Sequence, residues 1–210
     1  MKTMLMVTFL SLSYVPSAIS QEETLFGSDI ESCWYGGPFL KTGPVNGSLG
    51  LFVGGEGGWI INHQFVLGAK GYILTNPVDI DGLQNIDVGF GCGGIFCGYV
   101  VASDDLLHFG IENLVGLGGV YNDVKDYAQY HAPMEYTGDA CLVVEPGINL
   151  LLNVTKDFRL GAGITYRYVN GIAYDPGAPY RVLNGNDYEN ISDADVSGMT
   201  AQLIFKFGEF

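Results

Sequence analysis

Positive charge is scarce in this 210-residue chain. It carries 9 Lys and Arg residues against 23 Asp and Glu residues, which gives a formal net charge of −14 at neutral pH. Proteins that bind nucleic acid need clustered Lys and Arg to contact phosphates. The composition therefore excludes nucleic acid as a partner. The acidic residues gather in 21–31 and in the connectors between apolar segments, which is typical of a solvated surface.

Long apolar runs are also missing. No segment reaches the ~18 uninterrupted apolar residues that a membrane-spanning helix requires. The first twenty residues combine a positive start at Lys2, a short apolar run Met4–Leu12 and small residues just before Gln21. This pattern predicts a cleaved secretory signal peptide at 1–20.

The four cysteines show none of the paired spacings of a zinc site. Cys92 and Cys97 fall on one predicted strand, roughly 16 Å apart and on opposite faces, which is too far for a disulfide. We expect mostly free thiols, with a Cys97–Cys141 pair across the interior as the alternative. The stretch 89–94 spells G-x-G-x-x-G, but an apolar strand follows it instead of the helix that a dinucleotide site needs. The sequence thus indicates neither a metal nor a cofactor.

What the chain does contain is alternation with a period of two. In 158–169 one face reads Phe, Leu, Ala, Ile, Tyr, Tyr and the other reads Arg, Gly, Gly, Thr, Arg, Val. Such a period predicts a β-strand with two unlike surroundings. The apolar face is the continuous one, and the charges fall on the face of small and polar residues. This is the arrangement of a barrel that meets lipid outside and is polar inside.

Eight such segments are predicted, joined by connectors of alternating length. Their bounds are 33–42, 48–61, 65–75, 85–101, 106–121, 139–153, 158–170 and 195–209. Apart from a brief first link, the connectors at 62–64, 102–105 and 155–157 are tight, whereas 76–84, 122–138 and 171–194 are long. Short turns at one end and long loops at the other are typical of membrane barrels. The sequence therefore predicts an all-β, antiparallel, up-and-down transmembrane barrel of eight strands.

Charged residues on the small and polar face are predicted to fill the barrel interior. They are Glu56, Lys70, Glu112, Glu145, Arg159, Arg167 and Lys206. Centring the tight hairpins on their turns places Glu56 opposite Lys70. The same construction places Glu145 opposite Arg167, and opposite charges across strands stabilise a sheet. An eight-stranded interior holds only its own side chains, so we expect a plugged polar lumen without an open channel.

The apolar face is predicted to meet lipid. It is assigned Leu51, Val53, Trp59, Phe65, Leu67, Phe90, Phe96, Phe109, Val115, Leu142, Leu150, Phe158, Leu160, Leu203 and Phe205. Aromatic residues near the two ends of the strands predict two interfacial girdles. The girdle at the tight turns is assigned Trp59, Phe65, Phe158 and Phe207, and the girdle at the long connectors Tyr121, Tyr166 and Tyr168. On the inner face, His108 and Glu112 are expected to lie opposite Tyr99 and Ile95. Asn113 falls on the outer face, and the pattern gives no reason for a polar residue there.

These features together resemble the small eight-stranded outer-membrane β-barrels of bacteria, of the outer-membrane protein A (barrel part) and protein X type. The resemblance covers 33–210 and includes the terminal segment 203–210. In that family the last strand ends in an aromatic residue that the barrel-assembly machinery reads. Phe210 matches it, although Phe207 and Phe205 have the other parity. The resemblance implies a bacterial outer-membrane location, with the bilayer and lipopolysaccharide as surroundings and 21–32 as a short acidic periplasmic lead.

Function follows less directly from the pattern. We expect a non-enzymatic barrel with a structural, adhesion or surface-binding role through its 171–194 connector, for a ligand that the sequence does not identify. The contact residues expected there are Tyr174, Tyr180, Arg181 and Tyr188. Some barrels of the resembled family are lipid-modifying enzymes (acyl transfer or deacylation) with a catalytic His at the outer rim, and His131 is the rim candidate for that alternative. A soluble ligand-binding barrel is disfavoured, because its polar and apolar faces would be reversed.

Overall fold

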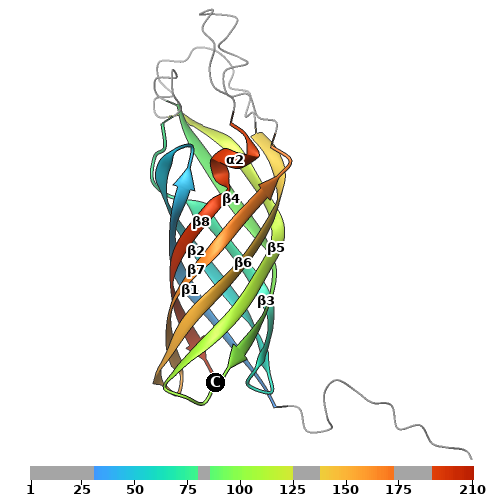
Figure 1. Cartoon of the computed structure of the whole chain (residues 1–210), viewed down its shortest axis with the longest axis vertical. Coiled ribbons are helices and arrows are strands. Elements are labelled where there is room, and N and C mark those ends of the chain that lie inside the picture. The colour runs from blue at the N-terminus through green and yellow to red at the C-terminus, as the bar shows by residue number, and fades with distance from the viewer. Residues whose placement is uncertain (1–30, 80–85, 125–137, 173–190) are drawn as a thin grey trace, which may run out of the picture. The chain divides into compact units, whose positions relative to one another are not determined.

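The computed structural model describes residues 31–79, 86–124, 138–172 and 191–210, and eight strands make up most of this part of the chain. They are β1 (Ser32–Val45), β2 (Ser48–Ile61), β3 (Phe65–Leu74), β4 (Ile86–Val101), β5 (Leu107–Val124), β6 (Gly138–Thr155), β7 (Phe158–Asn170) and β8 (Gly198–Gly208). Each strand pairs antiparallel with the next, and β8 pairs with β1, so the sheet closes into a barrel (Figure 1). The predicted fold class, an all-β antiparallel barrel of eight strands, is confirmed.

The two ends of the barrel differ in their connectors. We call the end with the short connectors 62–64, 102–106 and 156–157 the turn end, and the opposite end the loop end. The hairpin β1–β2 at the loop end is also tight, because Asn46 and Gly47 adopt positive φ values of 46° and 72°. Two consecutive left-handed residues form the turn that matches the twist of a hairpin.

One short helix, α2 (Asp193–Val196), lies at the loop end before β8 (Figure 1). The sequence predicts the eighth strand from 195, but the structure begins β8 at Gly198. Ser192 and Asp195 cap one another's backbone N–H groups as a capping box, which favours a helical turn there over strand. No helix among the described residues is long and apolar enough to span a bilayer.

The register of β4 against β5 differs from the prediction. Gly98 lies opposite Glu112, and Tyr99 lies opposite Ile111, so neither Tyr99 nor Ile95 faces the inner residues of β5. The connector is longer than the predicted turn 102–105, and Ala102 takes a left-handed φ of 56°. A register shift by an odd number of residues turns every side chain of a strand to the other face.

This shift corrects the predicted faces of β4. Phe90 and Phe96, predicted to meet lipid, point inward and are fully buried. Ile95 is 66 % exposed and Tyr99 is 37 % exposed, so both lie on the outer wall. Cys92 is buried and Cys97 is exposed, as the opposite-face prediction requires. The alternative Cys97–Cys141 disulfide is wrong, because Cys97 faces outward while Cys141 is buried inside.

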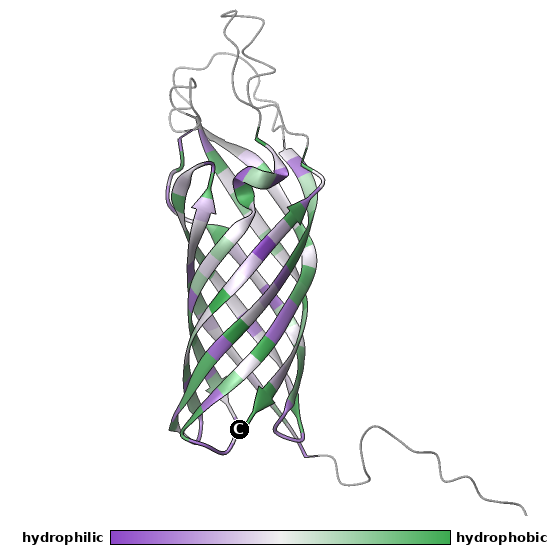
Figure 2. Cartoon of the chain, viewed as in Figure 1, coloured by the Kyte–Doolittle hydropathy of each residue, from purple (hydrophilic) through white to green (hydrophobic). Residues whose placement is uncertain are grey.

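On the other strands the predicted outer residues do lie outside. The exposed ones are Leu51, Val53, Trp59, Phe65, Leu67, Phe109, Val115, Leu142, Leu150 and Leu203. Figure 2 shows hydrophobic residues recurring along the strands, interspersed with more hydrophilic ones. Near the turn end, aromatic rings pair across strands: Phe158 stacks on Phe207 at 4.9 Å, and Phe65 meets Tyr99 edge-on at 5.1 Å. Cross-strand aromatic pairs of this kind stabilise the wall.

The barrel interior as candidate functional site

Four charged side chains form a buried network in the barrel interior. The Nζ atom of Lys70 lies 2.9 Å from Glu112 Oε1 and 3.1 Å from Glu56 Oε2. Lys206 Nζ lies 3.0 Å from Glu56 Oε1. All four side chains are buried. Since two cations meet two carboxylates, this four-charge network is neutral as a whole, and Lys70 is the side chain that bridges both glutamates.

Neutral polar groups complete the network. The side-chain amide of Gln202 donates to Glu112 at 2.9 Å and to Asn149 at 2.8 Å. Its oxygen accepts a hydrogen bond from Lys70 at 3.2 Å. Buried polar groups that lack partners are costly, whereas a satisfied network helps to specify one arrangement. The network therefore links β2, β3, β5, β6 and β8 across the lumen.

A second charged cluster lies around Glu145. Its carboxylate forms an ion pair with Lys41 and accepts hydrogen bonds from Thr165 and from the Tyr72 hydroxyl, the latter at 2.7 Å. Lys41 is buried and was missed by the sequence analysis. The alternation of β1 could have found it. Lys41 is two residues from the inward-facing Phe39 and therefore lies on the same face of the strand, whereas the residues on either side of Lys41 lie on the outer face.

The predicted pairing of Glu145 with Arg167 is corrected by the structure. The flanking pair Val144–Tyr168 keeps the predicted register of β6 on β7. The carboxylate nevertheless turns across the lumen to Lys41 on β1, which is distant in sequence. Barrel closure brings Lys41 to Glu145, and Arg167 donates its hydrogen bonds to backbone carbonyl groups instead.

Arg167 holds the loop end of the barrel together. Its Nε donates to the carbonyl of Val196 in α2 at 2.5 Å, and its Nη2 donates to the carbonyl of Pro44 at the end of β1 at 2.6 Å. The guanidinium also lies over the rings of Phe52 and Phe90, at 4.6 and 5.1 Å from their centroids. Arg167 is fully buried. It therefore joins β7, α2 and the β1–β2 hairpin.

Residues 191–197, which we call the cap segment, rest on the same end of the interior. Ile191 and Val196 are buried in the apolar core. The N–H of Ile172 donates to Asp193 Oδ1 at 2.7 Å, and the N–H of Asn46 donates to the carbonyl of Asp195 at 2.7 Å. Apolar burial and hydrogen bonds thus fix the cap segment to the strands around it.

The C-terminal residue lies against an inward arginine at the turn end. The guanidinium of buried Arg159 lies 4.1 Å from the ring centroid of Phe210, and Tyr35 lies 6.1 Å from that ring. Phe207, by contrast, is 52 % exposed on the outer wall. Phe210 therefore differs from the preceding aromatic residues of β8 in the direction of its ring.

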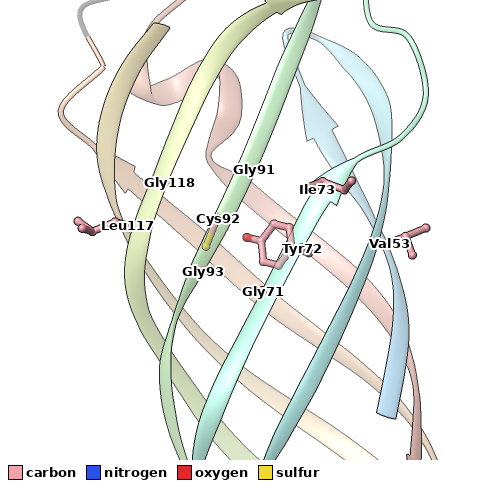
Figure 3. A pocket seen from close by; sticks show the side chains of 9 residues that line it. All are labelled: Val53, Gly71, Tyr72, Ile73, Gly91, Cys92, Gly93, Leu117 and Gly118. Atoms are coloured by element: carbon pink, nitrogen blue, oxygen red, sulfur yellow. The ribbon is translucent and has the colours of Figure 1, made fainter. Parts of the chain in front are cut away.

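The barrel has a small cavity in its interior and a much larger hollow on its outer wall. An interior cavity lined by Glu112, Asn149 and Lys206 measures about 20 Å³, which is room for one water molecule. A hollow of about 460 Å³ on the wall has a floor of glycines, and Figure 3 shows Val53 and Leu117 pointing away from the barrel on its two sides. Neither holds a cluster of catalytic groups, and the described residues contain no group of His, Cys, Asp and Glu that is able to hold a metal ion.

Several predicted residues lie outside the described part of the chain. These are the expected contact residues Tyr174, Tyr180, Arg181 and Tyr188, and the alternative catalytic residue His131. The predicted signal peptide 1–20 and nearly all of the acidic lead 21–32 also lie outside it.

Comparison with known proteins supports the architecture. No family model matches the chain, and no curated protein matches its sequence. The N-terminal β-barrel domain of OprF from Pseudomonas aeruginosa is similar in structure, with a TM-score of 0.50 and 12 % identity over 84 % of this chain and 96 % of that one. Neisserial surface protein A has a TM-score of 0.51 and 11 % identity over 86 % of this chain and 98 % of that one. Together with the closed barrel described above, this likeness shows that the chain has the fold of the small eight-stranded outer-membrane β-barrels.

Proposed function

We propose that this protein is a bacterial outer-membrane barrel that crosses the bilayer with β1–β8, conducts no solutes and displays its long connectors at the cell surface. The observation that carries the proposal is the distribution of charge in the strands. Lys41, Lys70 and Lys206 are buried inside, whereas apolar residues such as Leu51 and Leu117 are exposed outside. A soluble protein rarely exposes so large an apolar surface, but a bilayer requires it.

The contents of the interior support the absence of a pore. The four-charge network and the Glu145 cluster reach across the lumen from opposite strands. The cap segment with Arg167 lies at the loop end, and Phe210 with Arg159 lies at the turn end. Side chains fill an eight-stranded interior in the same way in other small barrels. A structural or surface-binding role is therefore favoured over transport.

Surface binding would be the task of the long connectors at the loop end. In many proteins a rigid scaffold holds variable surface loops, and these loops carry the residues that bind ligands. We propose Tyr174, Tyr180, Arg181 and Tyr188 as contact residues of that surface. The lead 21–32 would lie on the periplasmic side after removal of 1–20, and the barrel-assembly machinery would read Phe210 during insertion.

Membrane fractionation and a heat-shift gel test the membrane proposal. The protein, produced in a bacterium with an outer membrane, is expected in the outer-membrane fraction. Unheated samples in detergent should migrate differently from boiled ones, because the closed barrel resists unfolding. A mature polypeptide that is monodisperse in plain buffer refutes the proposal.

Two further measurements test closure and binding. Planar-bilayer recordings beside a general porin should show no conductance steps, and steady steps would contradict a filled interior. For binding, a variant with serine at the four proposed contact residues should lose adhesion to host cells or matrix components while its heat shift stays unchanged. Equal adhesion by this variant and the wild type would contradict their role.

A further inference from the structure

Among the buried Lys and Arg side chains of the described residues, Arg159 alone has no oxygen partner. The three buried lysines form ion pairs with glutamates, and Arg167 donates to two backbone carbonyl groups. Arg159 is 6 % exposed, and no described carboxylate, that of Phe210 included, forms an ion pair with it. The ring of Phe210 attracts the guanidinium but does not neutralise it. Because a buried charge without a counter-ion is costly, an anion from outside the chain would be stabilising here.

The guanidinium group of Arg159 is accessible from the turn end. Arg159 is the second residue of β7 and follows directly on the turn 156–157. Its Nε atom is enclosed and has no partner. Its two Nη atoms have no hydrogen-bond partner among the described residues either, but they are not enclosed. An anion in the water at the turn end therefore reaches the Nη atoms without displacing a group of the protein.

The residues beside Arg159 on the neighbouring strands do not compensate its charge. Lys206 lies directly opposite on β8, and Glu56 neutralises it at 3.0 Å. On β6 the residue opposite is Asn153, whose amide NH2 group donates to carbonyl groups in the connector 102–106. An amide is neutral, so even a hydrogen bond from Arg159 to its oxygen would leave the positive charge in place.

We propose that the turn end of the barrel holds a binding site for a small oxyanion, in which Arg159 binds a phosphate or carboxylate group through its Nη atoms. A guanidinium presents parallel N–H donors that match two oxygen atoms of such a group. Because Arg159 is buried within the barrel and not exposed on its wall, the site suits a soluble anion better than a lipid headgroup. The inference relies on the proposed function only for placing the turn end in the periplasm.

A half-buried thiol beside the site makes binding measurable in the native chain. Strand β1 pairs with β8 at Tyr35 and Gly208. Continued by two residues, this register brings Phe210 beside Cys33, and the charge of Arg159 acts on the Cys33 thiol. The remaining three thiols lie inside the barrel or on its lipid-facing wall. An anion bound to Arg159 should therefore shield Cys33 from a reagent that approaches from the turn end.

The experiment follows modification of Cys33 by a methanethiosulfonate that carries a sulfonate, read by mass spectrometry of the peptide. The protein is held in a maltoside detergent, which contains no phosphate. Compared with chloride at equal ionic strength, inorganic phosphate should slow the modification half-maximally at about 1–10 mM. Acetate in a parallel titration ranks a carboxylate against a phosphate. At ten times the half-maximal concentration, phosphate should also raise the ratio of folded to unfolded protein in urea about tenfold.

Three variants locate the effect. Arg159→Gln removes the charge and should abolish both responses to phosphate. Arg159→Lys keeps the charge without the paired donors and should respond more weakly than the wild type. Lys156→Met removes an exposed cation from the adjacent turn, and its response should equal that of the wild type.

Several results would overturn the site. One is equal modification of the wild type in phosphate and in chloride, and another is an equal phosphate effect in Arg159→Gln. Protection by phosphatidylglycerol vesicles without added phosphate would assign Arg159 to a lipid headgroup instead. The exposed Asp104 acts on Arg159 from beyond ion-pair distance. If it closes onto Arg159 in solution, phosphate sensitivity should appear in Asp104→Asn and be missing from the wild type, which also refutes the site.

The heat shift is recorded on the same samples. An intact heat shift without a phosphate effect refutes the oxyanion site alone, whereas loss of the heat shift and of membrane recovery refutes the proposed function.

Discussion

Replacement of Lys70 by methionine is the most informative test of the interior. Methionine keeps the length of the side chain but removes the cation that contacts Glu56 and Glu112. Glu56 retains its ion pair with Lys206 at 3.0 Å, whereas Glu112 retains a hydrogen bond from the Gln202 side-chain amide at 2.9 Å. The uncompensated charge therefore falls on Glu112. Removal of one partner from a buried ion pair costs about 3–5 kcal/mol, and we expect Lys70→Met to lower the free energy of unfolding by that amount.

The assay is urea unfolding of the protein in lipid vesicles, followed by the fluorescence of Trp34 and Trp59, which are exposed on the wall. The double variant Lys70→Met with Glu112→Gln removes both charges and should recover all but about 1–2 kcal/mol of the loss. Lys156→Met is the matched control, because the Lys156 side chain is 90 % exposed in a turn, and its unfolding midpoint should equal that of the wild type. A Lys70→Met protein within about 1 kcal/mol of the wild type would refute the buried ion pairs of Lys70 with Glu56 and Glu112.

Three further predictions concern other parts of the barrel. Arg167→Lys keeps the charge but is unable to bridge two carbonyl groups in the same planar geometry, so unfolding in urea should show a loss of about 1.5–3 kcal/mol; an unchanged midpoint would mean that this bridge contributes nothing. Gly54→Ala places a Cβ atom close to Phe39 and the backbone of β3 and should cost about 1–3 kcal/mol, whereas Gly55→Ala, with its nearest atom at 3.8 Å on the outer face, should be neutral; equal effects on the heat shift would contradict the assigned faces. Phe210→Ala should reduce the fraction of protein that reaches the heat-shifted form in cells, and pulse-chase samples with an unaltered fraction would argue against its role in assembly.

The wall and much of the interior are foreseeable from sequence, because the alternation of a strand is a local property. Glu56 and Lys70 illustrate this. The tight turn at 62–64 fixes the pairing of β2 with β3, and the structure places these two residues directly opposite each other. The outward position of Asn113 follows from the same alternation. Each of these inferences needs only one strand or one hairpin.

The remaining features depend on the closed barrel. The connector between β4 and β5 sets which face of β4 points inward. Because this connector is longer than the predicted turn, the predicted inner and outer faces of β4 are exchanged, and Phe90 and Phe96 are buried inside. Glu145 turns to Lys41 because closure brings β1 across the lumen from β6, and no pattern within either strand records that distance. Arg167 likewise finds its acceptors in α2 and the end of β1. By itself the sequence determined which residues alternate, since that is set by backbone geometry along a strand. Only the tertiary structure decided which buried charges meet, because that depends on where side chains from distant strands converge in three dimensions.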